Sequence, residues 1–406
     1  MALGIKQDEE YVGVKPVEEC HRIDEASLDR WMRRNIEGYL GQLTVLQFKG
    51  GQSNPTYRLN TPGASYVMRR KPFGKLLPSA HAVDREFKVI EALHKQGFLV
   101  ARPYALCLDE EVIGSAFYIM SMEAGRVFWN PTLPSQPPRE RSLIFTNKII
   151  TLARLHSYDP EKIGLGDFGK PGNYFARQVD RWTKQYRAST IDVIPEMDRL
   201  IEWLPRTVPE QKRVSVVHGD YRLDNIIFHP IEPRVIAVLD WELSTLGDPM
   251  ADFTYLLMQW VMPGLEGADL KQLNIPTIEE AEEIYCKASG QSSISRHQLV
   301  LFLQSLPACR HHARHCCADK GRYRSERQSC RIGGAMLSRL RGRLGVSLKR
   351  PAQPREGRWN KSPNQSFANS IAEMSKPNKL RRPRSLKFYL DATTEWTCGG
   401  SELGSI

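Results

Sequence analysis

The chain has 406 residues, of which 41% are hydrophobic and 25% are charged. This length corresponds to about two or three compact domains, and the composition excludes collagen-like and wholly disordered chains. The longest apolar stretches, around Val235–Leu239 and Phe253–Met262, are shorter than the roughly 18–20 residues that cross a bilayer. The first residues lack the apolar core of a secretory signal. We therefore expect no membrane span and a cytoplasmic location.

The formal net charge of +11 comes entirely from the end of the chain. Residues 301–406 contain 21 Lys and Arg against 7 Asp and Glu, whereas residues 1–300 contain 36 against 39. Because the main part of the chain has no basic excess, nucleic acid is not expected as its partner. The cysteines of this main part, Cys20, Cys107 and Cys286, are expected to be reduced thiols.

Residues 43–124 have the pattern of a small sheet with one long helix. Runs of β-prone residues, separated by turn residues, predict about five strands, at 44–48, 56–59, 66–70, 103–109 and 115–122. Apolar residues at helical spacing predict a helix over Asp84–Lys95, with Gly97 as its stop. Residues 1–42 are expected to form an N-terminal extension with a helix.

Residues 125–300 are predicted to be mainly helical. They begin with a loop over 125–140 that contains four prolines. Amphipathic patterns then predict helices at 142–157, 174–186, 194–204 and 248–260. A β-rich block at 214–242 interrupts these helices.

The β-rich block carries three polar residues whose types and spacing suit phosphoryl transfer. Asp220 and Asn225 lie in the sequence HGDYRLDN, and Asp240 follows the next apolar strand in VLDWE. Phosphoryl transfer needs a carboxylate beside the acceptor hydroxyl and oxygen ligands that hold Mg²⁺ against the nucleotide phosphates. We therefore expect Asp220 to be the catalytic carboxylate and Asn225 and Asp240 to be metal ligands.

This block resembles the catalytic loop of the aminoglycoside phosphotransferase and choline kinase family, whose fold is a two-lobed relative of the protein kinases. The pattern His-Gly-Asp-x-x-x-x-Asn at 218–225, followed by Leu-Asp-Trp-Glu at 239–242, is far more specific than any one of its residues. The resemblance implies an α+β fold with a β-rich N-lobe at 43–124 and a mainly helical C-lobe at 125–300. It also implies ATP as phosphoryl donor, Mg²⁺ as cofactor and a small-molecule hydroxyl group as acceptor.

The resemblance also assigns nucleotide contacts to the N-lobe. Arg69 stands where a kinase-like strand presents its phosphate-binding lysine, and Glu86 on the next helix is the expected ion-pair partner. Arginine can neutralise phosphate and bind a carboxylate with two donors, although its geometry differs from that of lysine. The turn expected to cover the phosphates with backbone N–H groups consists of Gly50, Gly51, Gln52, Ser53 and Asn54.

The sequence is most similar to a phosphotransferase-like domain that occurs alone in bacteria and fused to an acyl-CoA dehydrogenase domain in some animal proteins. The similarity runs from about Leu43 to Ile294 and includes the segments GGQSNPTY, RRKP and LDWELSTLGDPMAD. It implies a functional link to an acyl-CoA dehydrogenase and an acceptor that is a hydroxylated acid or a hydroxyacyl thioester. A catalytically inactive, kinase-like binding module is the alternative.

Several neighbouring residues have a structural interpretation. We expect His218 to pack and hydrogen-bond within the loop, and Asp252 either to anchor that loop or, with Asp248, to cap a helix. Glu242 could bind metal indirectly, but a solvated turn acid is the favoured interpretation. Three tryptophans in helical patterns are assigned to the core, namely Trp182, Trp203 and Trp260.

Residues 301–406 form a basic tail that is rich in arginine and cysteine. Fifteen of its 21 basic residues are arginine, which is typical of coding sequence read in a wrong frame or of an altered splice product. We expect this tail to be disordered and dispensable for the fold, and a genuine basic interaction tail is the alternative. Its cysteines and histidines lack the paired spacing of a zinc site.

Overall fold

A computed structural model describes about three fifths of the chain, within a unit that comprises the first 340 residues. The described residues are 13–49, 54–72, 82–170, 172–189, 198, 201–202, 204–206, 210–260, 265 and 267–294. The predictions for residues 50–53, for 301–406, for Trp203 and for the side chain of Trp182 fall outside this part, as does most of the helix predicted at 194–204.

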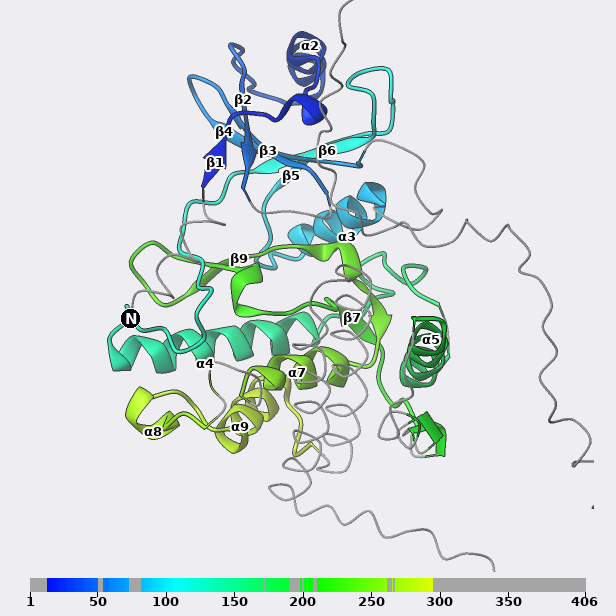
Figure 1. Cartoon of the computed structure of the whole chain (residues 1–406), viewed down its shortest axis with the longest axis vertical. Coiled ribbons are helices and arrows are strands. Elements are labelled where there is room, and N and C mark those ends of the chain that lie inside the picture. The colour runs from blue at the N-terminus through cyan, green and yellow to red at the C-terminus, as the bar shows by residue number, and fades with distance from the viewer. Residues whose placement is uncertain are drawn as a thin grey trace, which may run out of the picture. The chain divides into compact units, whose positions relative to one another are not determined.

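The N-lobe is built on a six-stranded antiparallel sheet with the order β1-β2-β3-β4-β6-β5 (Figure 1). Its strands are β1 (Val14–Lys15), β2 (Thr44–Phe48), β3 (Thr56–Asn60), β4 (Ser65–Arg70), β5 (Pro103–Cys107) and β6 (Phe117–Ser121). The five predicted strands are confirmed, and β1 adds one from the N-terminal extension. The central strand β4 carries Arg69, which is paired in register with Tyr118 of β6.

Two α-helices pack on this sheet. The helix α2 (Glu25–Asn35) begins at Asp24, whose side chain accepts a hydrogen bond from the Ser27 amide, and it buries Leu28 and Met32 in the core of the lobe. The helix α3 (Val83–Lys95) buries Val89, Ile90 and Leu93 and carries Glu86 on the same buried side. Gly97 lies just past the end of α3, as predicted, and its φ of +68° is readily adopted only by glycine.

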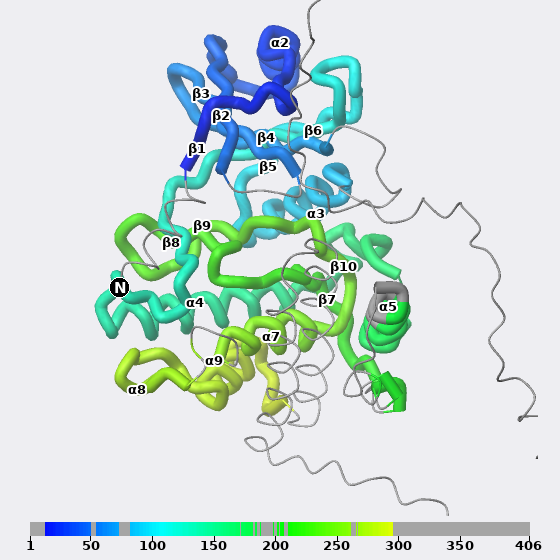
Figure 2. The backbone as a smooth tube through the Cα atoms, in the orientation of Figure 1, coloured from blue at the N-terminus to red at the C-terminus, as the bar shows by residue number. Residues whose placement is uncertain are grey.

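The C-lobe combines helices with two short antiparallel ribbons. The ribbons pair β7 (Ser215–Val217) with β10 (Thr245–Gly247) and β8 (Ile226–Phe228) with β9 (Val235–Val238). Figure 2 shows them between the N-lobe sheet and the helices of the C-lobe. These helices are α4 (Pro138–Leu155), α5 (Tyr174–Ser189), α7 (Met250–Leu257), α8 (Leu270–Leu273) and α9 (Ile278–Ser289). Short 3-10 helices are η1 (Glu19–His21), η2 (Leu204–Arg206), η3 (Leu223–Asn225), η4 (Trp241–Leu243) and η5 (Met258–Trp260).

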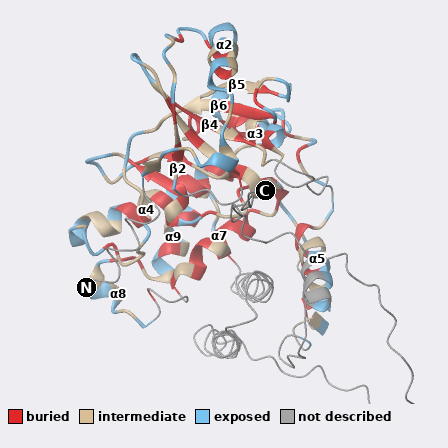
Figure 3. Ribbon diagram, turned by 45° about the horizontal axis from the view of Figure 1, so that its top comes forward, coloured by how far each residue is buried: buried red, intermediate tan, exposed pale blue. Residues whose placement is uncertain are grey.

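The core of the C-lobe lies where α4, α7 and α9 meet, and Figure 3 shows buried residues on each of these helices. Phe253 of α7 stacks on Tyr285 of α9 with ring centroids 4.2 Å apart. Trp260 is buried, as predicted for the core, and its indole nitrogen donates to the Pro276 carbonyl. Tyr255 is the one residue of α7 that is partly exposed, and its hydroxyl contacts Asp220, which follows the ribbon strand β7.

The described part of the chain contains no helix with the length and apolar character needed to cross a bilayer. Of the three cysteines predicted to be reduced, Cys107 and Cys286 are free, buried thiols, and Cys20 is exposed.

Candidate functional site

The β8–β9 hairpin brings together the three residues of the predicted phosphoryl-transfer motif. Asn225 directly precedes β8, and Asp240 follows two residues after the end of β9. The Leu239 amide donates to the Asn225 carbonyl at 2.9 Å, so the two ends of the hairpin are closed. The Asn225 side-chain amide donates to the Asp220 carbonyl oxygen at 2.9 Å and to Asp220 Oδ2 at 3.2 Å.

Asp240 has a left-handed backbone conformation, with φ 64° and ψ 64°. This conformation costs on the order of 1–3 kcal/mol in a residue other than glycine, and aspartate tolerates it better than most. The neighbouring Trp241 supports it, because the ring is buried against His218 with centroids 4.6 Å apart and Nε1 donates to the Val238 carbonyl. The turn directs Asp240 toward the N-lobe, where it meets Arg69.

The loop that precedes Asp220 is anchored by Asp252 in the first turn of α7. The Asp252 carboxylate accepts hydrogen bonds from the amides of His218 at 2.6 Å and Gly219 at 2.8 Å. Glycine is required here, since φ is +84° and an added Cβ would lie 2.7 Å from the Leu243 carbonyl oxygen. The anchoring role predicted for Asp252 is therefore confirmed, whereas its alternative role as a helix cap is wrong. Asp248 instead accepts from the Met250 amide at the start of α7.

His218 has the structural role that the sequence predicts. Its side chain is fully buried, and its Nε2 lies 2.8 Å from the Leu239 carbonyl oxygen. This contact links the loop before Asp220 to the turn that carries Asp240.

Asp220 is surrounded by hydrogen-bond donors of the C-lobe. Its Oδ1 accepts a hydrogen bond from the Tyr255 hydroxyl at 2.6 Å and lies 3.4 Å from Arg222 Nε. The other end of the Arg222 guanidinium lies 3.0 Å from Asp224 Oδ2. Burial raises the pKa of the Asp224 carboxyl, while Arg222 opposes the shift.

A fully buried amine, that of Lys148 on α4, lies behind the catalytic loop. Its Nζ contacts Gln259 Oε1 at 2.7 Å, and the Tyr221 hydroxyl donates to the Lys148 carbonyl. Burial lowers the pKa of Lys148 to about 7, although the nearby Asp224 acts in the opposite direction. Sequence patterns did not indicate this residue, because a single lysine on an amphipathic helix is normally exposed.

Arg69 joins the two lobes. Its Nε lies 3.2 Å from Glu86 Oε2, which confirms the predicted ion pair. Its Nη2 contacts Asp240 Oδ1 at 2.8 Å and Glu242 Oε2 at 3.1 Å. One guanidinium from β4 therefore contacts three carboxylates, of which two belong to the C-lobe.

The charges in this cluster act on one another strongly because the groups are buried. Burial raises the pKa of Glu86 to about 7, and the charges of Asp240 and Glu242 add to this effect while Arg69 opposes it. Burial alone would lower the pKa of Arg69, but the three carboxylates hold it above its usual value. We infer that Arg69 stays protonated and stabilises the negative charge around it.

The interpretation of Glu242 as a solvated turn acid is wrong. Only 17% of its side chain is exposed, and its Oε2 contacts both Arg69 and the Asn54 side-chain amide, the latter at 3.3 Å. Oxygen atoms of Glu86, Asp240 and Glu242 lie within 4.8 Å of one another. Asn54 is 1% exposed and follows residues 50–53 directly, so the described end of the predicted phosphate-covering turn contacts the C-lobe.

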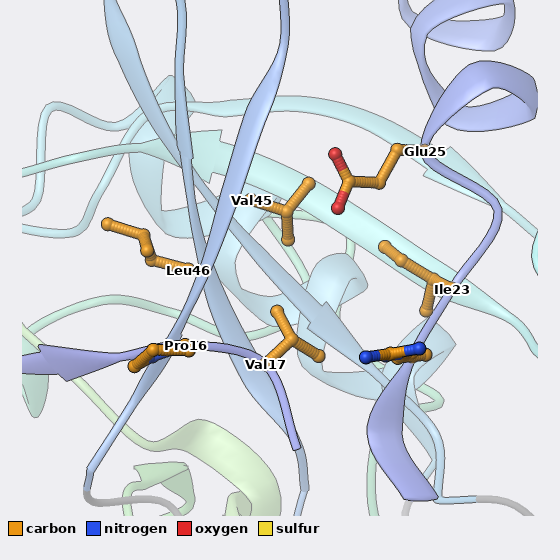
Figure 4. Close-up of a pocket in the computed structure, with 7 residues that line it drawn as sticks. Pro16, Val17, Ile23, Glu25, Val45 and Leu46 are labelled. Atoms are coloured by element: carbon orange, nitrogen blue, oxygen red, sulfur yellow. The ribbon is translucent and has the colours of Figure 1, made fainter. Parts of the chain in front are cut away.

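A pocket elsewhere in the N-lobe is separate from these residues. Figure 4 shows it between the N-terminal extension and β2, with lining residues Pro16, Val17, Arg22, Ile23, Glu25, Val45 and Leu46. None of the predicted site residues lines it, so it is not the phosphoryl-transfer site.

Among curated proteins, two relatives illustrate the similarity. "Acyl-CoA dehydrogenase family member 10" of Mus musculus is 44% identical over 284 residues, which are 68% of this chain and 27% of that protein. "Acyl-CoA dehydrogenase family member 11" of Homo sapiens is 42% identical over 284 residues, which are 68% of this chain and 36% of that protein. The chain thus spans about a quarter to a third of the length of these relatives.

Among solved structures, a protein of Ralstonia eutropha assigned to the aminoglycoside phosphotransferases is 43% identical, with a TM-score of 0.69 over 78% of this chain and 99% of that one. A choline kinase of Cryptosporidium parvum, 12% identical, shares the fold with a TM-score of 0.52 over 79% of this chain and 96% of that one. The predicted kinase-like fold, with a β-rich N-lobe and a helical C-lobe, is confirmed. Residues 44–282 match the family described as "Phosphotransferase enzyme family", and the chain belongs to that family.

Proposed function

We propose that the protein is an ATP- and Mg²⁺-dependent phosphotransferase that acts on a hydroxyl group of a small molecule. The observation that carries this proposal is the closed end of the β8–β9 hairpin. There the side chain of Asn225 donates to Asp220, and the backbone carbonyl of Asn225 accepts from Leu239, the residue before Asp240. Membership in the phosphotransferase family supports small-molecule kinase chemistry in general.

The oxygen atoms at the hairpin fit Mg²⁺, which binds carboxylate and carbonyl oxygen in preference to other ligands. Asn225 uses Nδ2 to contact Asp220, and none of the described residues donates a hydrogen bond to its Oδ1. Asp240 contacts Arg69 through Oδ1, and within the described ranges its Oδ2 likewise has no donor. Both oxygens are therefore available as metal ligands without loss of the contacts that hold them. When bound, the ion would neutralise charge on the phosphates of ATP.

The other residues have separate tasks in this proposal. Asp220 would orient the acceptor hydroxyl and accept its proton as the hydroxyl oxygen forms its bond to the γ-phosphorus and ADP leaves. Arg69, held by Glu86, would contact the α- and β-phosphates. Residues 50–54 would cover the phosphates with backbone amides. The rate would then come mainly from positioning and charge neutralisation.

For the acceptor, we propose a hydroxylated acid or a hydroxyacyl thioester. Support comes from the names of the two curated relatives, both acyl-CoA dehydrogenases that extend well beyond the matched region. A functional link to such a dehydrogenase is part of the proposal.

A catalytically inactive binding module is the second candidate. One observation favours it, since Arg69 replaces the usual lysine and already contacts Asp240, the proposed metal ligand. An arginine that remained on Asp240 would oppose binding of a second cation there.

A screen of ADP release separates the two candidates. The full chain is incubated with Mg·ATP and with choline, aminoglycosides, sugars or hydroxyacyl thioesters, and Mg·ATP binding is measured by titration calorimetry. The kinase proposal predicts binding together with ADP release that depends on one acceptor class and is lost in Asp220→Asn. Binding without ADP release from any acceptor would favour the binding module, and no binding would exclude the kinase.

A further inference from the structure

The hydroxyl of Tyr255 makes a direct contact with the proposed catalytic carboxylate. It donates to Asp220 Oδ1 at 2.6 Å, a short distance of the kind seen when the acceptor is charged. Tyr255 belongs to α7, which lies outside the sequence motif that contains Asp220. Every other residue of α7 is buried, so this side chain is where the helix reaches the partly exposed site.

The helix α7 holds the catalytic loop through contacts to both its backbone and a side chain. Asp252 binds the backbone amides of residues 218 and 219, and Tyr255, three residues later, binds the Asp220 side chain. Residues three apart lie on the same face of a helix, so both contacts come from one rigid surface. The backbone and the side chain of the loop are therefore positioned by the same element.

The two oxygens of Asp220 have different partners. Oδ2 accepts from the Asn225 amide at 3.2 Å, and Oδ1 accepts from Tyr255. Arg222 is a competing donor, since its Nε lies 3.4 Å from the same Oδ1 and half of its side chain is exposed. Loss of the Tyr255 hydroxyl would therefore leave Arg222, a half-exposed cation that also pairs with Asp224, as a donor at Oδ1.

We propose that Tyr255 is a positioning residue, whose hydroxyl fixes the orientation in which the Asp220 carboxylate meets the acceptor hydroxyl. This inference rests on the proposed phosphotransferase function. Its physical basis is that displacement of a reacting group by about 1 Å can cost roughly a hundredfold in rate. Tyr255 acts through Asp220, whereas Asp240 is contacted by Arg69, so the Tyr255 hydroxyl should not affect binding of the nucleotide.

The test compares Tyr255→Phe with Tyr221→Phe in the full chain. Both changes remove one phenolic hydroxyl from the same neighbourhood, but the Tyr221 hydroxyl donates to the Lys148 carbonyl oxygen and not to Asp220. We expect Tyr255→Phe to lower kcat about tenfold, with the KM for ATP and the calorimetric Kd for Mg·ATP unchanged. Tyr221→Phe should lower the Tm without this selective loss of kcat.

Equal kinetic effects in the two variants, or an unchanged kcat in Tyr255→Phe, would overturn the inference and leave the proposed function intact. Absence of acceptor-dependent ADP release in the unmodified protein would instead reject the proposed function. A crystal structure of Tyr255→Phe supplies a readout that does not depend on activity. We expect the Asp220 carboxylate to rotate toward Arg222, and an unchanged orientation would also overturn the inference.

Discussion

Asp220 and Asp240 lie at the same end of one hairpin but are held from different parts of the molecule. Asp220 is contacted by Tyr255 and Asn225, both of the C-lobe. Asp240 is contacted by Arg69, which reaches it from a strand of the N-lobe. The difference indicates that the proposed base is positioned within one lobe, whereas Asp240, one of the two proposed metal ligands, is also held from the other lobe. Changes near Asp220 should therefore affect turnover, and changes near Asp240 should affect nucleotide affinity and the association of the lobes.

The largest effect is expected from Arg69→Met, which removes the only guanidinium described between Glu86, Asp240 and Glu242. Removal of one partner from a buried ion pair typically costs about 3–5 kcal/mol, because the remaining charges are left uncompensated. Denaturant unfolding should show a decrease of this size in the free energy of unfolding, and Arg69→Lys should recover part of it.

Arg33→Met is the matched control for Arg69→Met. Arg33 also pairs with a carboxylate, that of Asp29, but about half of its side chain is exposed. Exposed pairs of this kind contribute about 0–1 kcal/mol. If the two variants lose equal stability, the contact between the lobes has no special energetic role.

The second prediction concerns turnover. Asp220→Ala should lower kcat by about a hundredfold or more, because it removes the group that receives the acceptor proton. The Kd for Mg·ATP should stay near normal, since the contacts of Asp240 with Arg69 are kept. Single-turnover kinetics and calorimetry measure the two quantities. Unchanged turnover would remove Asp220 from the mechanism.

The third prediction concerns Asp240, for which we expect weaker binding of Mg·ATP, the quantity that Asp220→Ala should leave near normal. Asp240→Ala removes a proposed Mg²⁺ ligand and should raise the Kd for Mg·ATP at least about tenfold, which corresponds to about 1.4 kcal/mol. The affinity for ATP without Mg²⁺ should change less, because Arg69 and the residues predicted to cover the phosphates, 50–54, remain. A normal Kd for Mg·ATP would show that the two aspartates do not divide their tasks in this way.

The sequence predicted those parts of the site whose residues are close in the chain. Asp220 and Asn225 are five residues apart, and the turn after the next strand carries Asp240, so one hairpin brings all three together. The Arg69–Glu86 pair could be predicted because it follows from a kinase-like order of strand and helix. The main strands and helices of both lobes could be predicted from runs of β-prone residues and from apolar residues at helical spacing.

The contacts that the sequence did not predict are long-range and involve common residue types. Tyr255 is 35 positions from Asp220, and Glu242 is 188 positions from Asn54. The turn position of Glu242 suggested exposure, but the approach of Arg69 from the other lobe makes it a buried ion-pair partner. A signal for Tyr255 was available, because it lies one helical turn after Asp252, which was expected to anchor the loop.

The smallest effect on nucleotide binding is expected from Lys148, the buried amine behind the Asp220 loop. Its burial makes the stability of this side of the site depend on pH. Its pKa is lowered from 10.5 to about 7 by burial, while Asp224 acts to raise it and Arg222 to lower it. As the pH rises past 7, the native state loses the proton that the unfolded state keeps until about pH 10.5. The wild-type protein should therefore gain stability between these values and carry the full cost of the buried charge below pH 7.

Lys148→Met removes this dependence while keeping most of the buried volume, so the variant should be more stable than the wild type, by about 2–3 kcal/mol more at pH 6 than at pH 9. Denaturant unfolding at the two pH values measures the difference. Lys162→Met is the control, because 82% of the Lys162 side chain is exposed, and its effect should not change with pH. Since Lys148 lies on the Asp220 side and has no described contact with Arg69 or Asp240, the Kd for Mg·ATP should be the same in the variant. A stability gain that is equal at both pH values would show that the buried amine stays protonated throughout this range, and a changed Kd would show that the two sides of the site are coupled.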